Sequence, residues 1–119
     1  MKPGSVVLLR IPGAAEGGTR PKLRPALVIA VLPGPYQNLL VCGVSTRLQD
    51  MEPDWDEVIA DSDADFATSG LHRTSAIRPS FLAAVVSAVV AGRIGEVSTA
   101  RLERVIARLV RHLSGAHPS

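Results

Sequence analysis

Short apolar runs, each ended by proline or glycine, are the feature that most constrains how this 119-residue chain can fold. Residues 5–11 are rich in valine and leucine and stop at Pro12-Gly13, and residues 25–32 stop at Pro33-Gly34-Pro35. A third run covers 39–46. Aliphatic and β-branched runs of this length between turn residues are typical of β-strands. The sequence therefore predicts a domain made mainly of strands.

Further strands are expected at 58–60, at 74–77 with an end or kink at Pro79, and at 93–97. Residues 81–92 are ambiguous, because their valines favour a strand while their alanines permit a helix. We favour a strand, since β-branched side chains lose rotamer freedom in a helix. The run at 25–32 is nearly all apolar, so we expect it in the centre of the sheet.

The last 22 residues contain the clearest helical pattern. Ser98 or Thr99 can cap this helix. Apolar residues recur at spacings of three and four, as one face of an amphipathic helix requires, at Leu102, Val105, Ile106, Leu109, Val110 and Leu113. The chain is therefore predicted to be mainly β with α: a small barrel closed by a C-terminal amphipathic helix, in one domain over 1–114, with a short flexible tail at 115–119.

Charge is distributed unevenly along the chain. Eight of the eleven acidic residues lie between 50 and 65, which leaves three acids against thirteen lysines and arginines elsewhere. A basic surface of this kind favours a polyanionic partner, either nucleic acid or an acidic protein segment. Ordinary solvated charge explains the same composition, so charge alone leaves both interpretations open.

Several chemistries lack the residues that they need. The single Cys42 cannot form an internal disulfide and is expected to be a buried strand residue. The spacing Asp61-x-Asp63-x-Asp65 resembles a calcium loop, but Phe66 and His72 stand where such a loop needs glycine and glutamate, which favours a solvated acidic loop. No metal or cofactor is predicted. Without a signal-peptide pattern or an apolar run of about 20 residues, we expect a cytoplasmic protein with no membrane association.

Arginines and hydroxyl residues gather where the predicted strands begin or end. Arg24 precedes one strand, Ser45, Thr46 and Arg47 end another, and Ser75 and Arg78 belong to a third. Strand ends of a small barrel can meet at one rim, where arginine binds a phosphate through paired hydrogen bonds and hydroxyls donate to its other oxygens. His72 is a candidate acid or base, because histidine changes charge near neutral pH.

A series of motifs extends along almost the whole chain. The series consists of Gly4-Ser5-Val6-Val7-Leu8, Arg24-Pro25-Ala26-Leu27-Val28-Ile29, Val41-Cys42-Gly43-Val44-Ser45-Thr46, Gly70-Leu71 with Ser75, and Arg93-Ile94-Gly95-Glu96-Val97-Ser98. Together these motifs resemble the PemK/MazF family of toxins. The resemblance implies an SH3-like barrel of the CcdB/MazF type and a homodimer. It also implies a metal-free, ribosome-independent endoribonuclease that cleaves single-stranded RNA such as mRNA and is restrained by an acidic antitoxin.

The resemblance also implies roles for individual residues. Arg24 and Ser45 fall on the catalytic pair, with serine in place of the usual threonine, and Arg78 matches an arginine used for cleavage in PemK-type members. Those members carry aspartate two residues later, often followed by glutamine, whereas this chain has Ser80-Phe81. That departure is compatible with altered specificity, slow cleavage or lost activity. RNA-binding residues are expected at Arg20, Lys22, Thr46, Arg47 and Ser75.

The implied reaction is attack of a ribose 2′-OH on the adjacent phosphodiester, which leaves a cyclic phosphate and a 5′-OH. Arg24 would stabilise the transition-state charge and Ser45 would hold a phosphate oxygen, while Arg78 and His72 are the candidates for the general base. A non-catalytic binding module remains an alternative because of Ser80. A CcdB-like topoisomerase inhibitor is another, although the chain ends in His117-Pro118-Ser119 rather than Trp-Gly-Ile.

Four arginines lie on the side of the helix away from its apolar residues, and they allow two interpretations. They can form an exposed basic strip that contacts the acidic antitoxin, or an ordinary solvated face. The four are Arg101, Arg104, Arg108 and Arg111.

Overall fold

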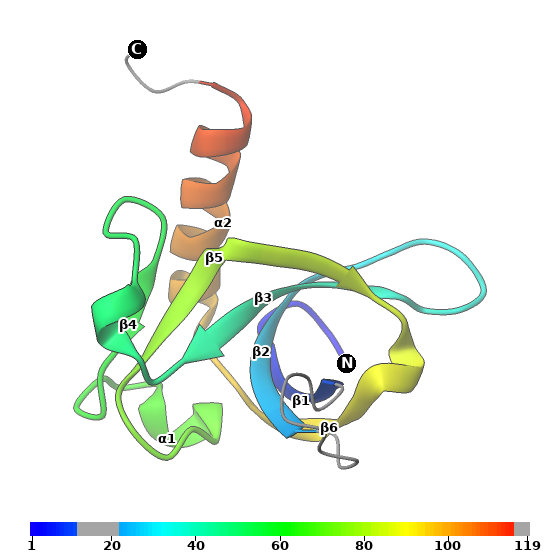
Figure 1. The fold of residues 1–119 in the computed structure, drawn as a ribbon, viewed down its shortest axis with the longest axis horizontal. Coiled ribbons are helices and arrows are strands. Elements are labelled where there is room, and N and C mark those ends of the chain that lie inside the picture. Colours follow the sequence, from blue (N-terminus) through cyan, green and yellow to red (C-terminus); the bar gives the residue numbers. More distant parts are fainter. Residues whose placement is uncertain (12–21, 116–119) are drawn as a thin grey trace.

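A computed structural model describes residues 1–11 and 22–115 and folds them into a six-stranded antiparallel sheet with a C-terminal helix (Figure 1). The order of strands across the sheet is β4-β5-β3-β2-β1-β6. The strands are β1 (Ser5–Ile11), β2 (Lys22–Val31), β3 (Leu39–Ser45), β4 (Glu57–Ile59), β5 (Ser75–Val85) and β6 (Val90–Glu96). The helical elements are η1 (Leu48–Asp50), α1 (Phe66–Ser69), η2 (Ser87–Val89) and α2 (Thr99–Leu113). No helix of the described part is long and apolar enough to span a membrane.

Strand β2 lies between β1 and β3, which confirms the central position predicted for the apolar run at 25–32. Both faces of the central strands are buried, because successive side chains of a strand point to opposite sides. Val6, Leu27 and Cys42 belong to a core cluster that also includes Val105 of α2. Val7 and Val28 belong to a second cluster with Val41. The central strands therefore need continuous apolar runs, whereas strands buried on one face alone would alternate apolar and polar residues.

The predicted closure of the sheet into a barrel is not confirmed. Hydrogen-bonded pairing among the described residues runs from β4 to β6 and leaves these two strands at the edges. Figure 1 shows a strongly curled sheet, with η2 connecting β5 to β6. The SH3-like detail stays a prediction, as does the flexible tail, since residues 116–119 lie outside the described part.

Proline 79 does not end β5, contrary to one of the two options predicted for it. The strand continues to Val85, and the register against β3 shifts at this point: Gly43 pairs with Arg78 whereas Cys42 pairs with Leu82. Residues 79–81 therefore form a bulge opposite two consecutive residues of β3. Proline suits a bulge because it has no N–H to donate to the ladder.

The ambiguous segment 81–92 contains two strands separated by a short turn rather than a single strand. Strand β5 ends at Val85, η2 occupies Ser87–Val89, and β6 begins at Val90, three residues before the predicted start of the last strand. The preference for strand over helix is therefore confirmed for most of this segment. The intervening turn η2 carries the chain from β5 to β6, which are not neighbours in the sheet.

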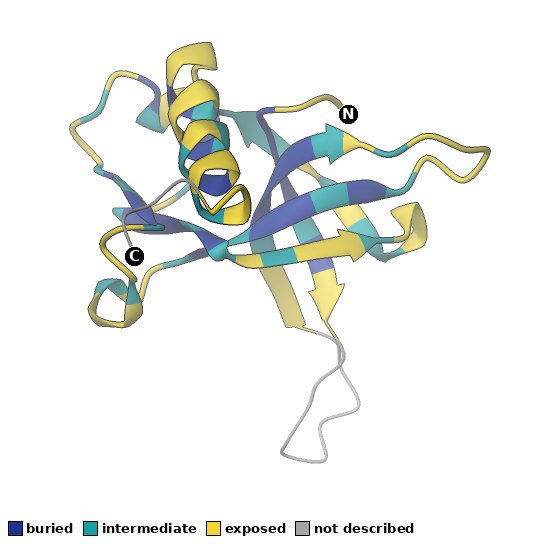
Figure 2. Ribbon diagram, turned by 90° about the horizontal axis from the view of Figure 1, so that it is seen from above, coloured by how far each residue is buried: buried dark blue, intermediate teal, exposed yellow. Residues whose placement is uncertain are grey.

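Helix α2 begins where the sequence predicts, and the Ser98 hydroxyl accepts a hydrogen bond from the Arg101 backbone N–H at 3.2 Å. Figure 2 shows the helix lying against one face of the sheet with its exposed side outward. Val105 and Leu109 are buried in that contact, while Val110 and Leu113 are exposed. The apolar stripe is thus only partly used in packing on the sheet.

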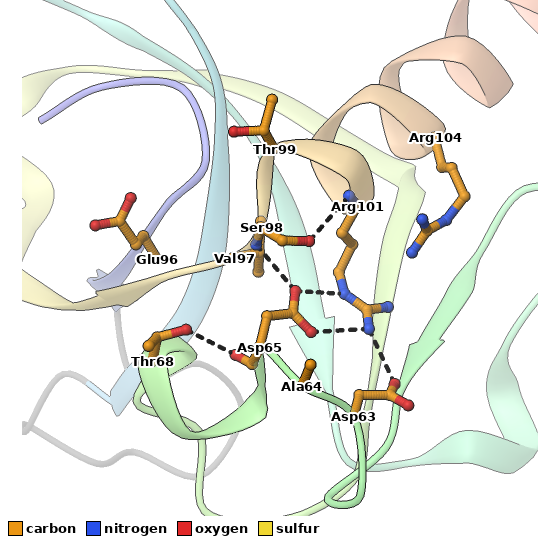
Figure 3. Close-up of a pocket in the computed structure, with 10 residues that line it drawn as sticks. All are labelled: Asp63, Ala64, Asp65, Thr68, Glu96, Val97, Ser98, Thr99, Arg101 and Arg104. Atoms are coloured by element: carbon orange, nitrogen blue, oxygen red, sulfur yellow. Dashed lines mark hydrogen bonds and ion pairs between the residues drawn. The ribbon is translucent and has the colours of Figure 1, made fainter.

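Arg101 is buried at the start of α2, with only 5% of its surface exposed, beside a pocket of about 560 Å³ (Figure 3). Its guanidinium makes two parallel hydrogen bonds to Asp65, with Nε–Oδ2 at 2.8 Å and Nη2–Oδ1 at 3.0 Å. It also binds Glu57 at 2.9 Å and Asp63 at 2.9 Å. Three acids from the polar segment are therefore held by one helix residue.

The predicted solvated acidic loop is wrong for Asp65, which is buried, whereas Asp63 is half-buried. Arg101 is also buried, so it belongs neither to an exposed basic strip that contacts an antitoxin nor to a solvated face, the two interpretations predicted for the helix arginines. Arg104 binds Glu57 at 3.1 Å, and Arg108 donates to the backbone carbonyl of Asp56. The polar face of α2 thus binds the acidic segment of its own chain.

Two glycines allow the end of α1 to contact β6 directly through backbone. Gly70 ends α1 with a φ of +76°, and a Cβ there would lie 2.2 Å from the carbonyl oxygen of Ile94. A Cβ at Gly95 would lie 2.2 Å from the carbonyl oxygen of Thr68. Neither position has space for a side chain. These contacts give a physical reason for two motifs that resemble the toxin family.

The first prediction concerns Gly95. Gly95→Ala should lower the free energy of unfolding by about 1–3 kcal/mol, because the backbone of α1 must move away from β6. Urea denaturation measures the change. Gly92→Ala in the same strand is the matched control, since a Cβ at Gly92 meets nothing within 4 Å. Equal stabilities for the two variants would contradict the close packing.

The second prediction concerns acid stability. The hydrogen bonds from Arg101 lower the pKa of Asp65 from 3.8 to about 2, so folding is stabilised by about 2 kcal/mol while the carboxylate is ionised in both states. That stability should be present above pH 4 and should disappear as the pH falls toward 2. Denaturation between pH 2 and 7 should show a flatter acid slope for Asp65→Asn than for wild type. Asp61→Asn, an exposed neighbour, should keep the wild-type slope.

Candidate functional site

A groove of about 960 Å³ lies where β2 begins and β3 ends, beside the bulge of β5. The floor includes small or apolar residues such as Ala26 and Gly43. Six of the residues predicted from sequence to be catalytic or RNA-binding line this one groove: Arg24, Ser45, Thr46, Arg47, Ser75 and Arg78. The fold therefore gathers residues that are up to 54 positions apart in the chain.

Strand register explains why Arg24 and Ser45 line the same groove. The pairing of β2 with β3 reaches Ala26 and Gly43, and each of the two residues lies two positions beyond this pair. Opposite residues of antiparallel strands point to the same face. Gly43 also pairs with Arg78 of β5, which places Arg78 on that face from the other side.

The Ser45 hydroxyl already has one local partner. Its oxygen accepts a hydrogen bond from the Arg47 backbone N–H at 3.0 Å, an arrangement that fixes the side chain at the end of β3. The hydroxyl proton has no acceptor among the described residues. Ser45 can therefore donate to an anionic ligand in the groove without losing its structural bond.

Arg78 is held from three directions. Its Nε donates to Asp56 at 2.9 Å, and its Nη2 donates to the backbone carbonyl of Asp50 at 2.8 Å. The guanidinium lies over the ring of Phe81, 4.3 Å from the centroid. Phe81 is 61% exposed and also lines the groove. The cation is thus fixed at the edge of the groove by a carboxylate, a carbonyl and an aromatic ring.

The lining of the groove is strongly basic. Arg24, Arg47, Arg73 and Arg78 are its arginines, and Asp50 is the one carboxylate among its described lining residues. Asp50 binds Arg47 at 2.8 Å. Arg24 and Arg73 are exposed and have no ion pair among the described residues. Such a lining attracts polyanions.

The sequence matches the model of the PemK-like, MazF-like toxins of type II toxin–antitoxin systems over residues 2–113. The chain belongs to this family. No curated protein sequence matches it.

Two solved structures have a similar fold. The Mycobacterium tuberculosis toxin MazF-mt6 superposes with a TM-score of 0.67 at 13% identity, covering 92% of this chain and 96% of that one. An endoribonuclease in complex with its cognate antitoxin, from mycobacterial species, gives a TM-score of 0.61 at 14% identity and covers 99% of both chains. At these identities the likeness shows the shared fold, and the family follows from the sequence model.

Other predicted site residues of this MazF-like chain have different surroundings. Ser75 is only 2% exposed, and its hydroxyl donates to the Arg73 carbonyl at 2.8 Å. Lys22 is exposed at the start of β2 but does not line the groove. Arg20 lies outside the described residues. His72 is exposed and lines the groove, as a candidate acid or base requires.

Sequence reasoning missed Asp56 and Arg73. Asp56 belongs to the acidic segment, where nothing distinguishes it from neighbouring carboxylates, and only its burial beneath Arg78 reveals a separate role. Arg73 follows His72 directly, and the basic pair just before a strand was a signal that could have been used.

Cys42 and the acidic residues bear on two other chemistries, reaction at a thiol and metal binding. Burial raises the pKa of the Cys42 thiol to about 12, with a smaller contribution from the Asp56 charge, so Cys42 is an inert core residue as predicted. The described residues contain no group of three or more histidines, cysteines or acids arranged to hold a metal. Asp63 and Asp65 instead bind Arg101.

Proposed function

We propose that this toxin-family member is a metal-independent endoribonuclease that cleaves single-stranded RNA, mRNA among its targets, in the groove of the curled sheet. The observation that supports the proposal is the gathering of Arg24, Ser45 and Arg78 at one groove. Each comes from a different strand, and four arginines in total line the groove. Family membership gives the expectation, and the gathering of these side chains supports it.

Single-stranded RNA suits the groove for electrostatic reasons. Its phosphates would contact Arg24, Arg47 and Arg73, while Thr46 offers an exposed hydroxyl at the end of β3. The bases would face the apolar part of the lining, where Phe81 is the aromatic side chain. Phosphate contacts of this kind provide affinity without reading the base sequence.

The proposed reaction is an internal transfer at phosphorus. The ribose 2′-oxygen forms a bond to the adjacent phosphorus, the bond from phosphorus to the 5′-oxygen breaks, and the products are a 2′,3′-cyclic phosphate and a 5′-OH. Arg24 and Arg78 would stabilise the charge that develops on the phosphoryl oxygens, and Ser45 would donate to one of them. Loss of one such donor typically slows a reaction by about 100- to 1000-fold.

The proton from the 2′-OH needs an acceptor. Arginine stays protonated across the pH range of proteins, so Arg78 is better suited to stabilising charge than to accepting a proton. His72 is exposed at the same groove, and histidine changes charge near neutral pH. We therefore assign His72 the role of general base.

The expected binding partners of this protein are inferred from its family. We propose that the protein acts in the cytoplasm as a homodimer and is restrained by an acidic antitoxin. One of the similar structures is an endoribonuclease in complex with its cognate antitoxin. The face of α2 that includes Arg101 is occupied by the acidic segment of this chain, so the antitoxin is expected to use another basic surface, for which the groove is the best candidate.

The third prediction tests cleavage directly. Purified protein incubated with a long single-stranded transcript in EDTA should release fragments with 5′-OH ends. Arg24→Ala and Ser45→Ala should each lower the initial rate by about 100-fold or more, because each removes a donor to the transition state. Ends are counted by phosphorylation with a kinase that requires a 5′-OH.

Arg10→Ala serves as the matched control. Arg10 is an exposed arginine of β1 outside the groove lining, where it donates to the backbone of Ala88 and Val90. This variant should cut at the wild-type rate. A wild-type protein that binds RNA but releases no 5′-OH fragments would support the binding-module alternative instead.

The fourth prediction concerns salt. Binding to a 2′-O-methyl RNA of mixed sequence, which lacks the nucleophile, should weaken as salt rises. Arg73→Ala should reduce the slope of log affinity against log salt by about 0.7, the value for one phosphate contact on a single strand. Fluorescence anisotropy measures the slope, and Arg10→Ala should leave it unchanged. Equal slopes for wild type and Arg73→Ala would remove Arg73 from the interface.

A further inference from the structure

Ser80 stands where the resemblance to PemK-type toxins implies an aspartate, two residues after Arg78. We propose that Asp56, from the segment before β4, supplies the missing carboxylate and positions Arg78 for the reaction. The proposal rests on the proposed nuclease function for its catalytic consequence. Asp56 does not touch the substrate in this scheme, because it is only 1% exposed, and it acts through Arg78.

Asp56 is buried but fully used as a hydrogen-bond acceptor. Its Oδ2 accepts from the Arg78 Nε at 2.9 Å and from the Glu52 backbone N–H at 2.8 Å. Its Oδ1 accepts from the Ser80 hydroxyl at 2.8 Å and from the Ser80 backbone N–H at 3.4 Å. A buried carboxylate is tolerated only when it is paired and hydrogen-bonded to this degree.

The bulge of β5 explains why a carboxylate is needed at this place. Residues 79–81 are not paired with β3, so the backbone N–H of Ser80 has no partner in the ladder. Asp56 accepts from that N–H and from the arginine just before the bulge. One side chain therefore binds the residue just before the bulge and the middle residue of the bulge.

The consequence for Arg78 is a defined orientation. Nε is bound to Asp56 and Nη2 to the Asp50 carbonyl, while Nη1 has no hydrogen-bond partner among the described residues. The ring of Phe81 covers one face of the guanidinium. Nη1, with both of its N–H groups unused among the described residues, is thus the best-placed donor to a phosphate oxygen, and the carboxylate fixes which way it points.

In this proposal, Ser80 does not deprive the site of a carboxylate, because Asp56 supplies one and Ser80 binds it. Its hydroxyl donates to the carboxylate at 2.8 Å, so an aspartate at position 80 would set two negative charges side by side. Moving the negative charge from position 56 to position 80 should be tolerated, because the amide of an asparagine at 56 can donate to a carboxylate at 80. A double variant with both substitutions tests this exchange.

The fifth prediction compares Asp56→Asn, Ser80→Asp and the double variant Asp56→Asn/Ser80→Asp with wild type. Initial rates on a long single-stranded transcript are measured at saturating and at limiting RNA. Asp56→Asn should lose about 10- to 100-fold at saturating RNA, because a misplaced group costs that much in rate. Ser80→Asp should also lose activity, and the double variant should recover at least tenfold over Asp56→Asn.

A readout independent of cleavage follows the Arg78 Nε–H by NMR of ¹⁵N-arginine-labelled protein. Its exchange with water should be slow in wild type, faster in Asp56→Asn, and slow again in the double variant. If wild type does not cut RNA but this exchange pattern holds, the nuclease proposal fails while the positioning of Arg78 by Asp56 stands. A folded Asp56→Asn that cuts at the wild-type rate would overturn the catalytic part of the inference, and unchanged exchange would overturn the positioning itself.

Asp65→Asn is the matched control for stability. It removes another buried carboxylate that binds an arginine, but it lies outside the groove lining. All variants are assayed at a temperature at which circular dichroism shows them folded. Asp65→Asn should keep the wild-type rate. A loss equal to that of Asp56→Asn would show that lowered stability, rather than positioning, accounts for the effect.

Discussion

The ion cluster at Arg101 is the interaction on which the rest of the arrangement depends. One buried guanidinium binds Glu57, Asp63 and Asp65, and so fastens the acidic segment to the start of α2. Removing one partner from such a buried cluster typically costs about 3–5 kcal/mol, because the remaining charges stay buried without compensation. Arg108 extends the contact to the backbone of Asp56. Arg108, rather than Arg101, is therefore the helix residue that holds the backbone at Asp56.

This arrangement separates the charges of the chain into two regions. Glu57, Asp63 and Asp65 bind arginines of α2, while the arginines of the groove have only Asp50 and Asp56 as carboxylate partners among the described residues. A chain with a net charge of only +2 thus presents a concentrated basic surface at one place. Field strength at a binding site depends on such local distribution and not on net charge.

The contact between Asp56 and the bulge of β5 joins segments that are distant in the sequence. The backbone and hydroxyl of Ser80 bind a carboxylate that comes from more than 20 residues earlier. A sequence motif records only neighbours along the chain. Contacts between distant segments can take over the same physical task without leaving a motif.

The sequence by itself predicted most of the strands, the capped C-terminal helix and the gathering of Arg24, Ser45 and Arg78 at one place, because these follow from local spacing, turn residues and family motifs. Only the tertiary structure decided that Arg101 is a buried anchor and that Asp56 lies under Arg78. On a helix surface, a buried arginine and a solvated one have the same spacing. Burial depends on which distant carboxylates fold against that surface, and local sequence carries no record of that choice.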